Sequence, residues 1–208
     1  MTMRRQGRNA EPAHNDFRTV LHWYDFICPF CYVGQQQNAV LVRHGLRVVE
    51  MAFQAHPEIP PGGIPAGPRE AAMYAMLERE AKDAGLPLHW PHRLPNTRLA
   101  LAAAEWIRRH QPGSFPEFHK ELFAAHFVLG EDLEDTAVID RHAKASGIDI
   151  AALHGALADG SGTEAVTESE TLGRKYGVEG TPAWLLDQRL YVGLRPPGEF
   201  ARLAEHAF

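Results

Sequence analysis

The order of apolar and polar positions at the start of the chain predicts a β-α-β unit. Residues 19–26, TVLHWYDF, are rich in β-branched and aromatic side chains and predict a buried strand. Residues 32–44 contain few helix breakers and repeat apolar side chains at helical intervals, and Gly45 is typical of a helix end. Residues 46–54 alternate apolar and polar side chains well enough to predict a second strand.

A segment dense in proline and glycine, residues 56–68, separates this unit from a long helical region. From Arg69 to about Gly160 the pattern predicts helices and no strand. The predicted helices span residues 69–84, 99–110, 115–129, 136–146 and 150–157. We interpret residues 57–160 as an inserted, all-helical subdomain.

The last part of the chain returns to a mixed pattern. Residues 163–176 predict an amphipathic helix. Residues 183–186 and 190–192 predict two short strands with the spacing of a hairpin around Asp187–Gln188, and residues 197–207 predict a final helix. The complete order is β-α-β, a helical insertion, then α-β-β-α, which is an α/β fold with a central mixed sheet.

Composition and charge limit the classes of partner. The 208 residues, 45% hydrophobic and 23% charged, are typical of a globular protein with one domain and an insertion. The net charge of −5 argues against a general nucleic-acid binder, which needs a basic face. Residues 1–16 are polar, and no apolar run of signal-peptide or membrane-span length follows. We therefore expect a disordered leader over residues 1–16, a cytoplasmic location, and no nucleic-acid or membrane partner.

The two cysteines, Cys28 and Cys31, lie together where the first strand meets the first helix. A structural disulfide across so short a loop would constrain the unfolded chain very little. A structural zinc site usually needs four ligands, no third cysteine exists, and His89 and His92 flank a proline and are more typical of a loop. The spacing therefore favours a redox-active dithiol without a metal.

The position at a helix start explains how such a dithiol would work. Unpaired N–H groups and the helix dipole favour a thiolate at Cys28, and Cys31, one turn further, can attack a mixed disulfide formed there. We predict Cys28 as the nucleophile and Cys31 as the resolving thiol, with Pro29 suited to the first helical turn. Phe30 could form an apolar lip for substrates. Asp25, three residues before Cys28, is either a proton relay or a strand-end residue bonded to a local N–H.

A second motif, Gly180-Thr181-Pro182, precedes a predicted strand far along the chain. A proline in a tight turn can adopt a cis bond, which would expose the backbone of Thr181 to an extended substrate. The residues alone leave the trans bond open.

Two segments together resemble a known family. YDFICPFCYVG, residues 24–34, and KYGVEGTPAWLL, residues 175–186, resemble the DsbA-like branch of the thioredoxin superfamily. Within it, the chain is most similar to the cytoplasmic FrnE-like group, related to 2-hydroxychromene-2-carboxylate isomerases and kappa-class glutathione transferases. Residues 53–63 and 94–106 also resemble segments of that group. The resemblance implies a thioredoxin-like domain formed by residues 17–56 and 161–208.

The resemblance also implies roles for single residues. Cys28 and Cys31 would be the catalytic pair, Pro182 the cis-proline at the substrate cleft, and Thr181 the residue whose backbone faces the sulfur. Asn96 matches a segment near the cleft in related enzymes. The implied substrate-binding residues are therefore Thr181, Pro182, Pro29, Phe30 and Asn96.

The implied activity is that of a protein disulfide oxidoreductase or isomerase acting on a protein or small molecule that carries a disulfide or thiol. DsbA proper has a histidine between its cysteines, whereas Pro29-Phe30 stands here, which favours a reductase, an isomerase or a glutathione-coupled role. We expect no cofactor, with glutathione left open as a co-substrate and a homodimer left open as the assembly. Two alternatives remain. One is a glutathione-dependent isomerase or transferase, whose members commonly carry serine in place of the nucleophile; the other is a non-catalytic chaperone or binding module.

Overall fold

The structure, a computed structural model, describes residues 18–196 and 198–206. The leader predicted over residues 1–16 lies outside these ranges. Within them, no helix is both long and apolar enough to cross a membrane.

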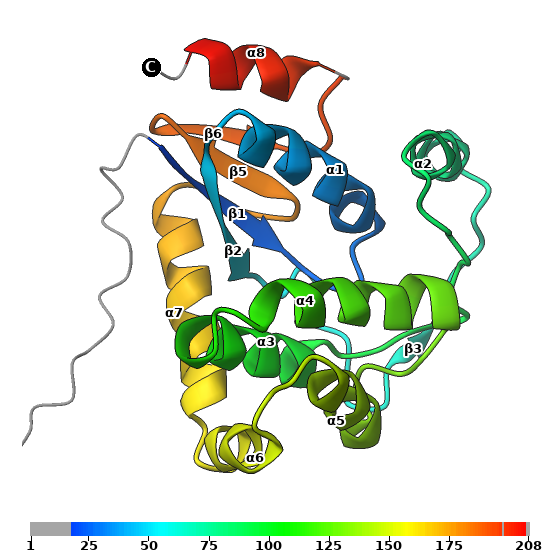
Figure 1. Cartoon of the computed structure of the whole chain (residues 1–208). Coiled ribbons are helices and arrows are strands. Elements are labelled where there is room, and N and C mark those ends of the chain that lie inside the picture. The colour runs from blue at the N-terminus through cyan, green and yellow to red at the C-terminus, as the bar shows by residue number, and fades with distance from the viewer. Residues whose placement is uncertain (1–17, 197, 207–208) are drawn as a thin grey trace, which may run out of the picture.

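A four-stranded mixed sheet lies at the centre of the molecule (Figure 1). Strand β1 (Thr19–Tyr24) runs parallel to β2 (Arg47–Ala52) and antiparallel to β5 (Ala183–Leu186). Strand β6 (Arg189–Val192) pairs antiparallel with β5, so the strand order is β2-β1-β5-β6. This topology confirms the predicted thioredoxin-like α/β fold with a mixed sheet.

Helices cover both faces of the sheet (Figure 1). Helix α1 (Pro29–Arg43) and helix α8 (Glu199–His206) pack on one face, and α7 (Ser161–Lys175) packs on the other. Side chains of β1 point alternately to the two faces: Val20 belongs to the apolar cluster under α1 and α8, and Trp23 to the cluster beside α7. Because β1 is covered on both faces, its sequence is almost continuously apolar rather than strictly alternating.

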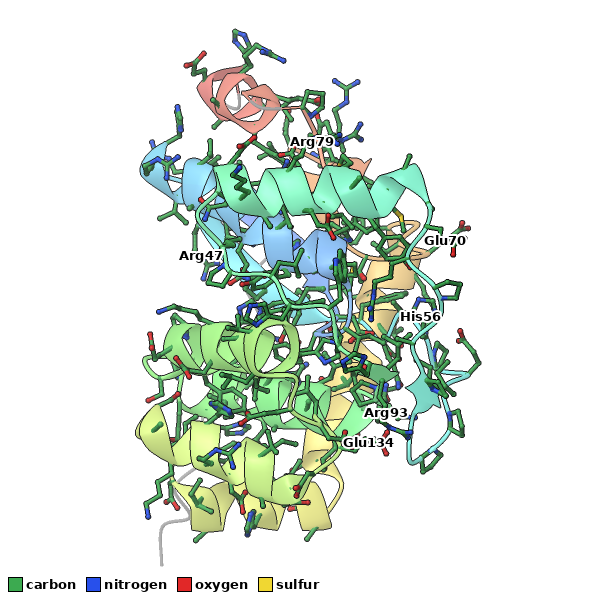
Figure 2. All side chains as sticks on the ribbon, turned by 90° about the vertical axis from the view of Figure 1, so that its right-hand side faces the viewer. Arg47, His56, Glu70, Arg79, Arg93 and Glu134 are labelled. Atoms are coloured by element: carbon green, nitrogen blue, oxygen red, sulfur yellow. The ribbon has the colours of Figure 1, made fainter. Side chains whose placement is uncertain are left out.

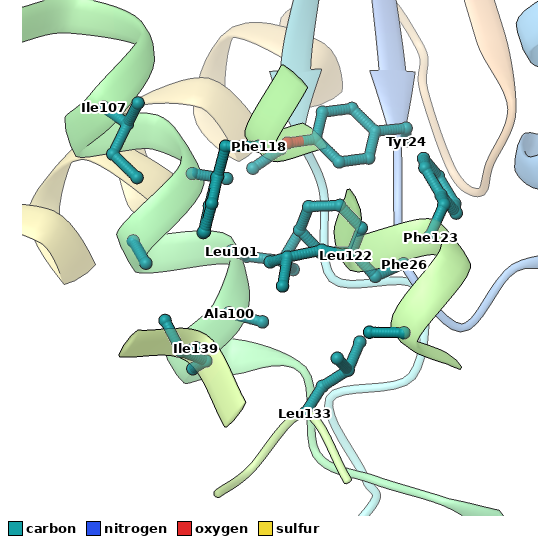
Figure 3. Close-up of a cluster of buried hydrophobic side chains, with 14 of the residues drawn as sticks. Tyr24, Phe26, Ala100, Leu101, Ile107, Phe118, Leu122, Phe123, Leu133 and Ile139 are labelled. Atoms are coloured by element: carbon teal, nitrogen blue, oxygen red, sulfur yellow. The ribbon is translucent and has the colours of Figure 1, made fainter. Parts of the chain in front are cut away.

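The insertion packs against the end of β1 through the largest apolar cluster of the protein (Figure 3). The ring of Tyr24, the last residue of β1, and the ring of Phe26, two residues later, both pack with Phe123 of α4. The insertion and the sheet therefore share one core, and the dithiol segment begins where they meet. The helices of the insertion are α2 (Ala72–Asp83), α3 (Arg98–His110), α4 (Phe115–Ala124), α5 (Thr136–Ala145) and α6 (Ile150–Ala158).

The insertion also contains two short strands where the sequence predicted none. Strand β3 (Ile64–Pro65) lies in the proline- and glycine-rich segment 56–68, hereafter the strap, and pairs antiparallel with β4 (Arg93–Leu94). The N–H of Gly62 in the strap donates a hydrogen bond of 2.7 Å to the carboxylate of Glu134, which lies next to Arg93 (Figure 2). Two-residue strands leave no alternating pattern, so sequence periodicity could not find them.

The helix predicted over residues 115–129 is not uniform. Helix α4 ends at Ala124, and Ala125–Leu129 form a π-helical turn that ends at Gly130, whose φ is 67°. Single π turns within or after α-helices are rare and are frequent at functional sites. One wider turn shifts the apolar pattern by a single residue, which is why periodicity did not reveal it.

Candidate functional site

Cys28 lies at the predicted junction between β1 and α1. Pro29 is the first helical residue, so Cys28 is the N-cap, with φ −79° and ψ 110°, and its side chain makes no capping hydrogen bond. The Cys28 carbonyl accepts hydrogen bonds from the N–H groups of Cys31 over 3.0 Å and of Tyr32 over 3.1 Å. The thiol therefore sits at the N-terminal end of α1, where backbone N–H groups and the helix dipole stabilise an anion.

The segment before β5 comes next to Cys28 although 153 residues separate them in the sequence. Strand β5 pairs with β1 at Ala183 opposite Trp23, and this register carries the preceding residues to the dithiol. The Cys28 thiol donates a hydrogen bond of 3.3 Å to the carbonyl of Thr181, and the Thr181–Pro182 peptide bond is cis. The structure thus brings both motifs together, while the part that Thr181 and Pro182 play in substrate binding stays a prediction.

The two thiols differ in exposure and in acidity. Cys28 is partly exposed and Cys31 is buried. Burial acts to raise the pKa of the Cys28 thiol, but hydrogen bonds from Cys31 and Thr181 outweigh it and lower that pKa. The Thr181 hydroxyl has no other partner among the described residues and is free to make such a bond. Burial and the neighbouring Cys28 raise the pKa of Cys31 well above its usual range. The thiolate therefore forms at Cys28, which is the chemistry of an attacking sulfur.

Asp25 is fully buried beside the dithiol. Its carboxylate accepts a hydrogen bond of 2.8 Å from the N–H of Ala55, and its backbone carbonyl accepts one of 3.1 Å from the N–H of Cys28. Burial raises the pKa of Asp25 from 3.8 to about 6. The structure therefore contains both features that the sequence left open: a carboxyl that titrates near neutral pH, and a bond to a local N–H.

A cavity of about 450 Å³ opens beside Cys28, within the size range of small-molecule pockets. Cys28, Pro29, Phe30 and Thr181 contribute to its wall, whereas Pro182 is not among the described residues that line it. Another part of the wall comes from the insertion, from which the sequence analysis assigned Asn96 alone to the cleft. It includes Arg69, Met73, Tyr74, Trp90, His126 and Phe127.

Asn96, predicted near the substrate, does not line this cavity in the described part of the chain. Its side-chain amide instead donates to the carbonyl of Ile59 over 2.6 Å and accepts from the side chain of Gln54 over 2.9 Å. Its backbone N–H donates to Glu134 over 2.6 Å. The structure therefore places Asn96 in the support of the strap.

The described residues contain no group of three or more histidine, cysteine, aspartate or glutamate side chains placed to hold a metal ion. His89, one of the two histidines weighed as zinc ligands, uses its Nδ1 atom in a hydrogen bond of 2.8 Å with the carbonyl of Val128.

A match to a family model identifies the protein family to which this chain belongs. The family model of the DSBA-like thioredoxin domain matches residues 19–204, which is nearly all of the described chain. The chain belongs to the DSBA-like thioredoxin domain family. This DSBA-like domain is also similar to the Bacillus subtilis protein YwbO, with 25% identity over 138 residues that cover 64% of this chain and 68% of YwbO.

Solved structures share the fold of this DSBA-like domain. A probable DsbA oxidoreductase from Streptomyces coelicolor superposes with a TM-score of 0.80 at 21% identity, covering 91% of this chain and 89% of that one. A 2-hydroxychromene-2-carboxylate isomerase gives a TM-score of 0.66 at 22% identity, covering 84% and 88%. The cytosolic disulfide reductase DsbM from Pseudomonas aeruginosa, solved with GSH, gives 0.62 at 20% identity, covering 90% and 96%. At these identities the likeness shows the shared fold.

Proposed function

We propose that this protein is a thiol-disulfide oxidoreductase that exchanges disulfides through the Cys28–Cys31 dithiol. The observation that carries the proposal is the asymmetry of the two thiols: a partly exposed Cys28 with a lowered pKa at a helix N-terminus, and a buried Cys31 with a raised pKa one turn further. Membership in the DSBA-like family and the oxidoreductases among its structural neighbours support this reaction class.

The chemistry consists of two exchanges. The Cys28 thiolate attacks one sulfur of the substrate disulfide, the substrate S–S bond breaks, and one substrate sulfur leaves as a thiolate. Cys31 then loses its proton and attacks Cys28, the mixed disulfide breaks, and the second substrate thiolate leaves. Two electrons pass from the dithiol to the substrate, and the two leaving thiolates take up protons. A thiol reductant, for which we propose glutathione, restores the dithiol by the reverse exchange.

Asp25 is our candidate for the proton transfer in the second exchange. The raised pKa of Cys31 means that its proton must be removed before it can attack. A carboxyl whose pKa is about 6 is largely ionised at neutral pH and can accept that proton. We propose that Asp25 holds the proton until a leaving thiolate takes it.

The reducing direction, with a role as reductase or isomerase, is the one that we propose. The dipeptide between the cysteines is Pro29-Phe30, so no charged side chain between them stabilises the Cys28 thiolate further. We further propose that the protein works in the cytoplasm, where dithiols are kept reduced. The partners would be proteins or small molecules that carry a disulfide.

A redox titration in glutathione buffers tests the proposal. The fractions of free and bonded Cys28 and Cys31 are measured by alkylation and mass at each buffer ratio. We expect one reversible two-electron transition. Cys28→Ser should abolish exchange, and Cys31→Ser should stop the reaction at a mixed disulfide on Cys28, because attack can begin and cannot resolve. Full multiple-turnover activity in Cys31→Ser would contradict the assigned roles.

A second candidate function has its own support. The cavity of about 450 Å³ is large enough for a small organic substrate, and one structural neighbour is a 2-hydroxychromene-2-carboxylate isomerase. A glutathione-dependent isomerase or transferase would show a glutathione adduct on Cys28 and no intramolecular disulfide at any buffer ratio. That result would replace the oxidoreductase proposal with this one.

A further inference from the structure

His126 is a buried histidine whose two ring nitrogens both lack a hydrogen-bond partner in the part of the chain that the structure describes. It is 1% exposed and lines the cavity that also holds Cys28. Among the other buried histidines, the Nε2 atoms of His22 and His119 also lack a partner in the described residues, but Nδ1 of His22 bonds Glu50 and Asn38, and Nε2 of His142 bonds Glu131. Because buried polar atoms are almost always hydrogen-bonded, an imidazole with two free nitrogens in a cavity wall calls for a ligand.

The backbone around His126 holds it in this wall. His126 lies in the π-helical turn Ala125–Leu129, between α4 and Gly130. The carbonyl of Phe127 accepts a hydrogen bond of 2.7 Å from the N–H of His89, and the carbonyl of Val128 accepts one of 2.8 Å from the His89 side chain. These bonds tie the π-helical turn to the segment that carries Trp90, the next part of the wall.

The remaining lining indicates what kind of group the cavity takes. Most of the wall is apolar or aromatic: Ile27, Phe30, Met73, Tyr74, Trp90, Leu94 and Phe127. Several other polar side chains have roles of their own. Arg69 donates to the carbonyl of Pro91 and lies over the Trp90 ring at 5.4 Å, His56 pairs with Glu58 over 2.8 Å, and the Thr181 hydroxyl faces the Cys28 sulfur. His126 therefore provides the buried polar atoms that an incoming group can satisfy.

We propose that His126 is a specificity-determining residue of the dithiol site, which binds an uncharged hydroxyl or amide at the tip of an apolar side chain next to the substrate disulfide. This inference rests on the proposed oxidoreductase function. Burial lowers the pKa of His126 to about 4, so at neutral pH the ring is uncharged and offers one donor and one acceptor. A hydroxyl or an amide can donate to or accept from whichever ring nitrogen it reaches, whereas a purely apolar side chain can do neither and an anion can only accept.

Matched peptide disulfides test the proposal. The probes are symmetrical disulfides of acetylated and amidated dipeptides, Cys-Tyr against Cys-Phe and Cys-Asn against Cys-Leu, together with the reversed orders, since the cavity does not fix the chain direction. The measurement is kcat/KM with glutathione as the source of electrons. For at least one pair we expect the wild type to prefer the polar member by roughly 2- to 10-fold, the range set by one hydrogen bond between uncharged groups.

The variants then separate His126 from general effects of burial. His126→Phe keeps a ring and removes both nitrogens, so the preference should fall to about 1-fold, whereas His126→Gln keeps a donor and an acceptor and should retain part of it. His119→Phe is the matched control: His119 is 5% exposed, its Nε2 atom also lacks a partner among described residues, and it lines a different cavity. That variant should keep the full preference.

The outcomes distinguish this inference from the proposed function. If the dithiol titrates reversibly but the wild type shows no preference, or no turnover of any probe, His126 does not determine specificity and the oxidoreductase function stands. An unchanged preference in His126→Phe has the same meaning. If the dithiol does not titrate, the proposed function fails first, and this inference fails with it.

Discussion

Replacing Asp25 with asparagine should make the protein more stable at neutral pH. Burial raises the pKa of Asp25 from 3.8 to about 6, and a tenfold change in acidity corresponds to about 1.4 kcal/mol, so the ionised carboxylate costs the folded state about 3 kcal/mol above pH 7. Asparagine removes the charge, and its oxygen can still accept the hydrogen bond from Ala55. The Thr97 hydroxyl, whose hydrogen bond to the carboxylate acts to lower the pKa of Asp25, can instead accept a hydrogen bond from the asparagine amide. We expect a net gain of about 2 kcal/mol at pH 7.5, after the loss of the 3.5 Å contact with the Ile27 N–H.

The gain in stability from Asp25→Asn should also depend on pH. Because the folded pKa of Asp25 lies above 3.8, the folded state binds more protons than the unfolded state between pH 3.8 and about 6. The contribution of Asp25 to the free energy of unfolding therefore falls as pH rises through this window and is constant above it. The difference in free energy of unfolding between Asp25→Asn and the wild type should be larger at pH 7.5 than at pH 5 by about 1.5 kcal/mol.

Urea unfolding of the reduced proteins at pH 5 and pH 7.5 measures this difference directly. The comparison between variant and wild type cancels the titration of all other groups that the substitution leaves unchanged. Asp187→Asn provides the matched control, because it makes the same chemical change at an exposed position in the turn between β5 and β6. An equal effect of Asp25→Asn at pH 5 and pH 7.5 would refute the reasoning that burial of this charge sets its acidity.

Three further substitutions test other parts of the structure. Gly173→Ala would place a Cβ atom 2.9 Å from Nε1 of Trp23, so urea unfolding should show that the free energy of unfolding falls by about 1 to 3 kcal/mol. If the variant were instead more stable, as the higher helix propensity of alanine alone would make it, that result would count against the close packing of α7 on the sheet. Asn38→Leu would remove the 2.8 Å hydrogen bond to the Glu50 carboxylate and leave the buried indole N–H of Trp184 without its acceptor. In the same assay it should lower the free energy of unfolding by about 2 to 4 kcal/mol. A neutral result would mean that the network rearranges. Glu134→Gln leaves one side-chain oxygen for the backbone N–H groups of Gly62 and Asn96, so amide hydrogen exchange should become faster in the strap, with a smaller change in the global free energy of unfolding. Unchanged exchange protection would show that these hydrogen bonds do not hold the strap in place.

Most of the fold could be predicted because its elements are long enough to show their period. Strand β1 begins at its predicted first residue and helix α1 begins three residues before its predicted range, and the two-residue turn at Asp187–Gln188 was visible as hairpin spacing. Both turn residues have positive φ, 47° and 59°, which such tight turns commonly require. The strands β3 and β4 were missed, since a pair of two-residue strands is defined by its partner across the strap and not by its own sequence.

Some residues of the candidate site could also be predicted from the sequence, and others could not. Cys28 and Cys31 could be found because their chemistry depends on residue type, on spacing and on the start of a helix, all of which are local. Thr181 required a resemblance, since its approach to Cys28 depends on the pairing of β5 with β1. Asn96 was assigned to the cleft by the same resemblance, but in this chain its polar atoms support the strap. His126 gave no local signal, because a buried histidine in an amphipathic helix has the same pattern as one that faces a cavity.

The acidity of Cys28 and the shape of the cavity depend on different parts of the fold, so two kinds of variant should have different effects. The acidity of Cys28 depends on the N-terminus of α1, on Cys31 and on Thr181, all of which belong to the sheet and the elements beside it. The far wall of the cavity depends on α2, on the segment around Trp90 and on the π-helical turn, all of which belong to the insertion. A substitution at His126 should therefore change which disulfide reacts and leave the midpoint of the dithiol titration unchanged. Thr181→Val, which removes a hydroxyl able to bond the thiolate, should instead shift the midpoint and affect all peptide probes alike, since differences in thiolate stability appear directly in the reduction potential.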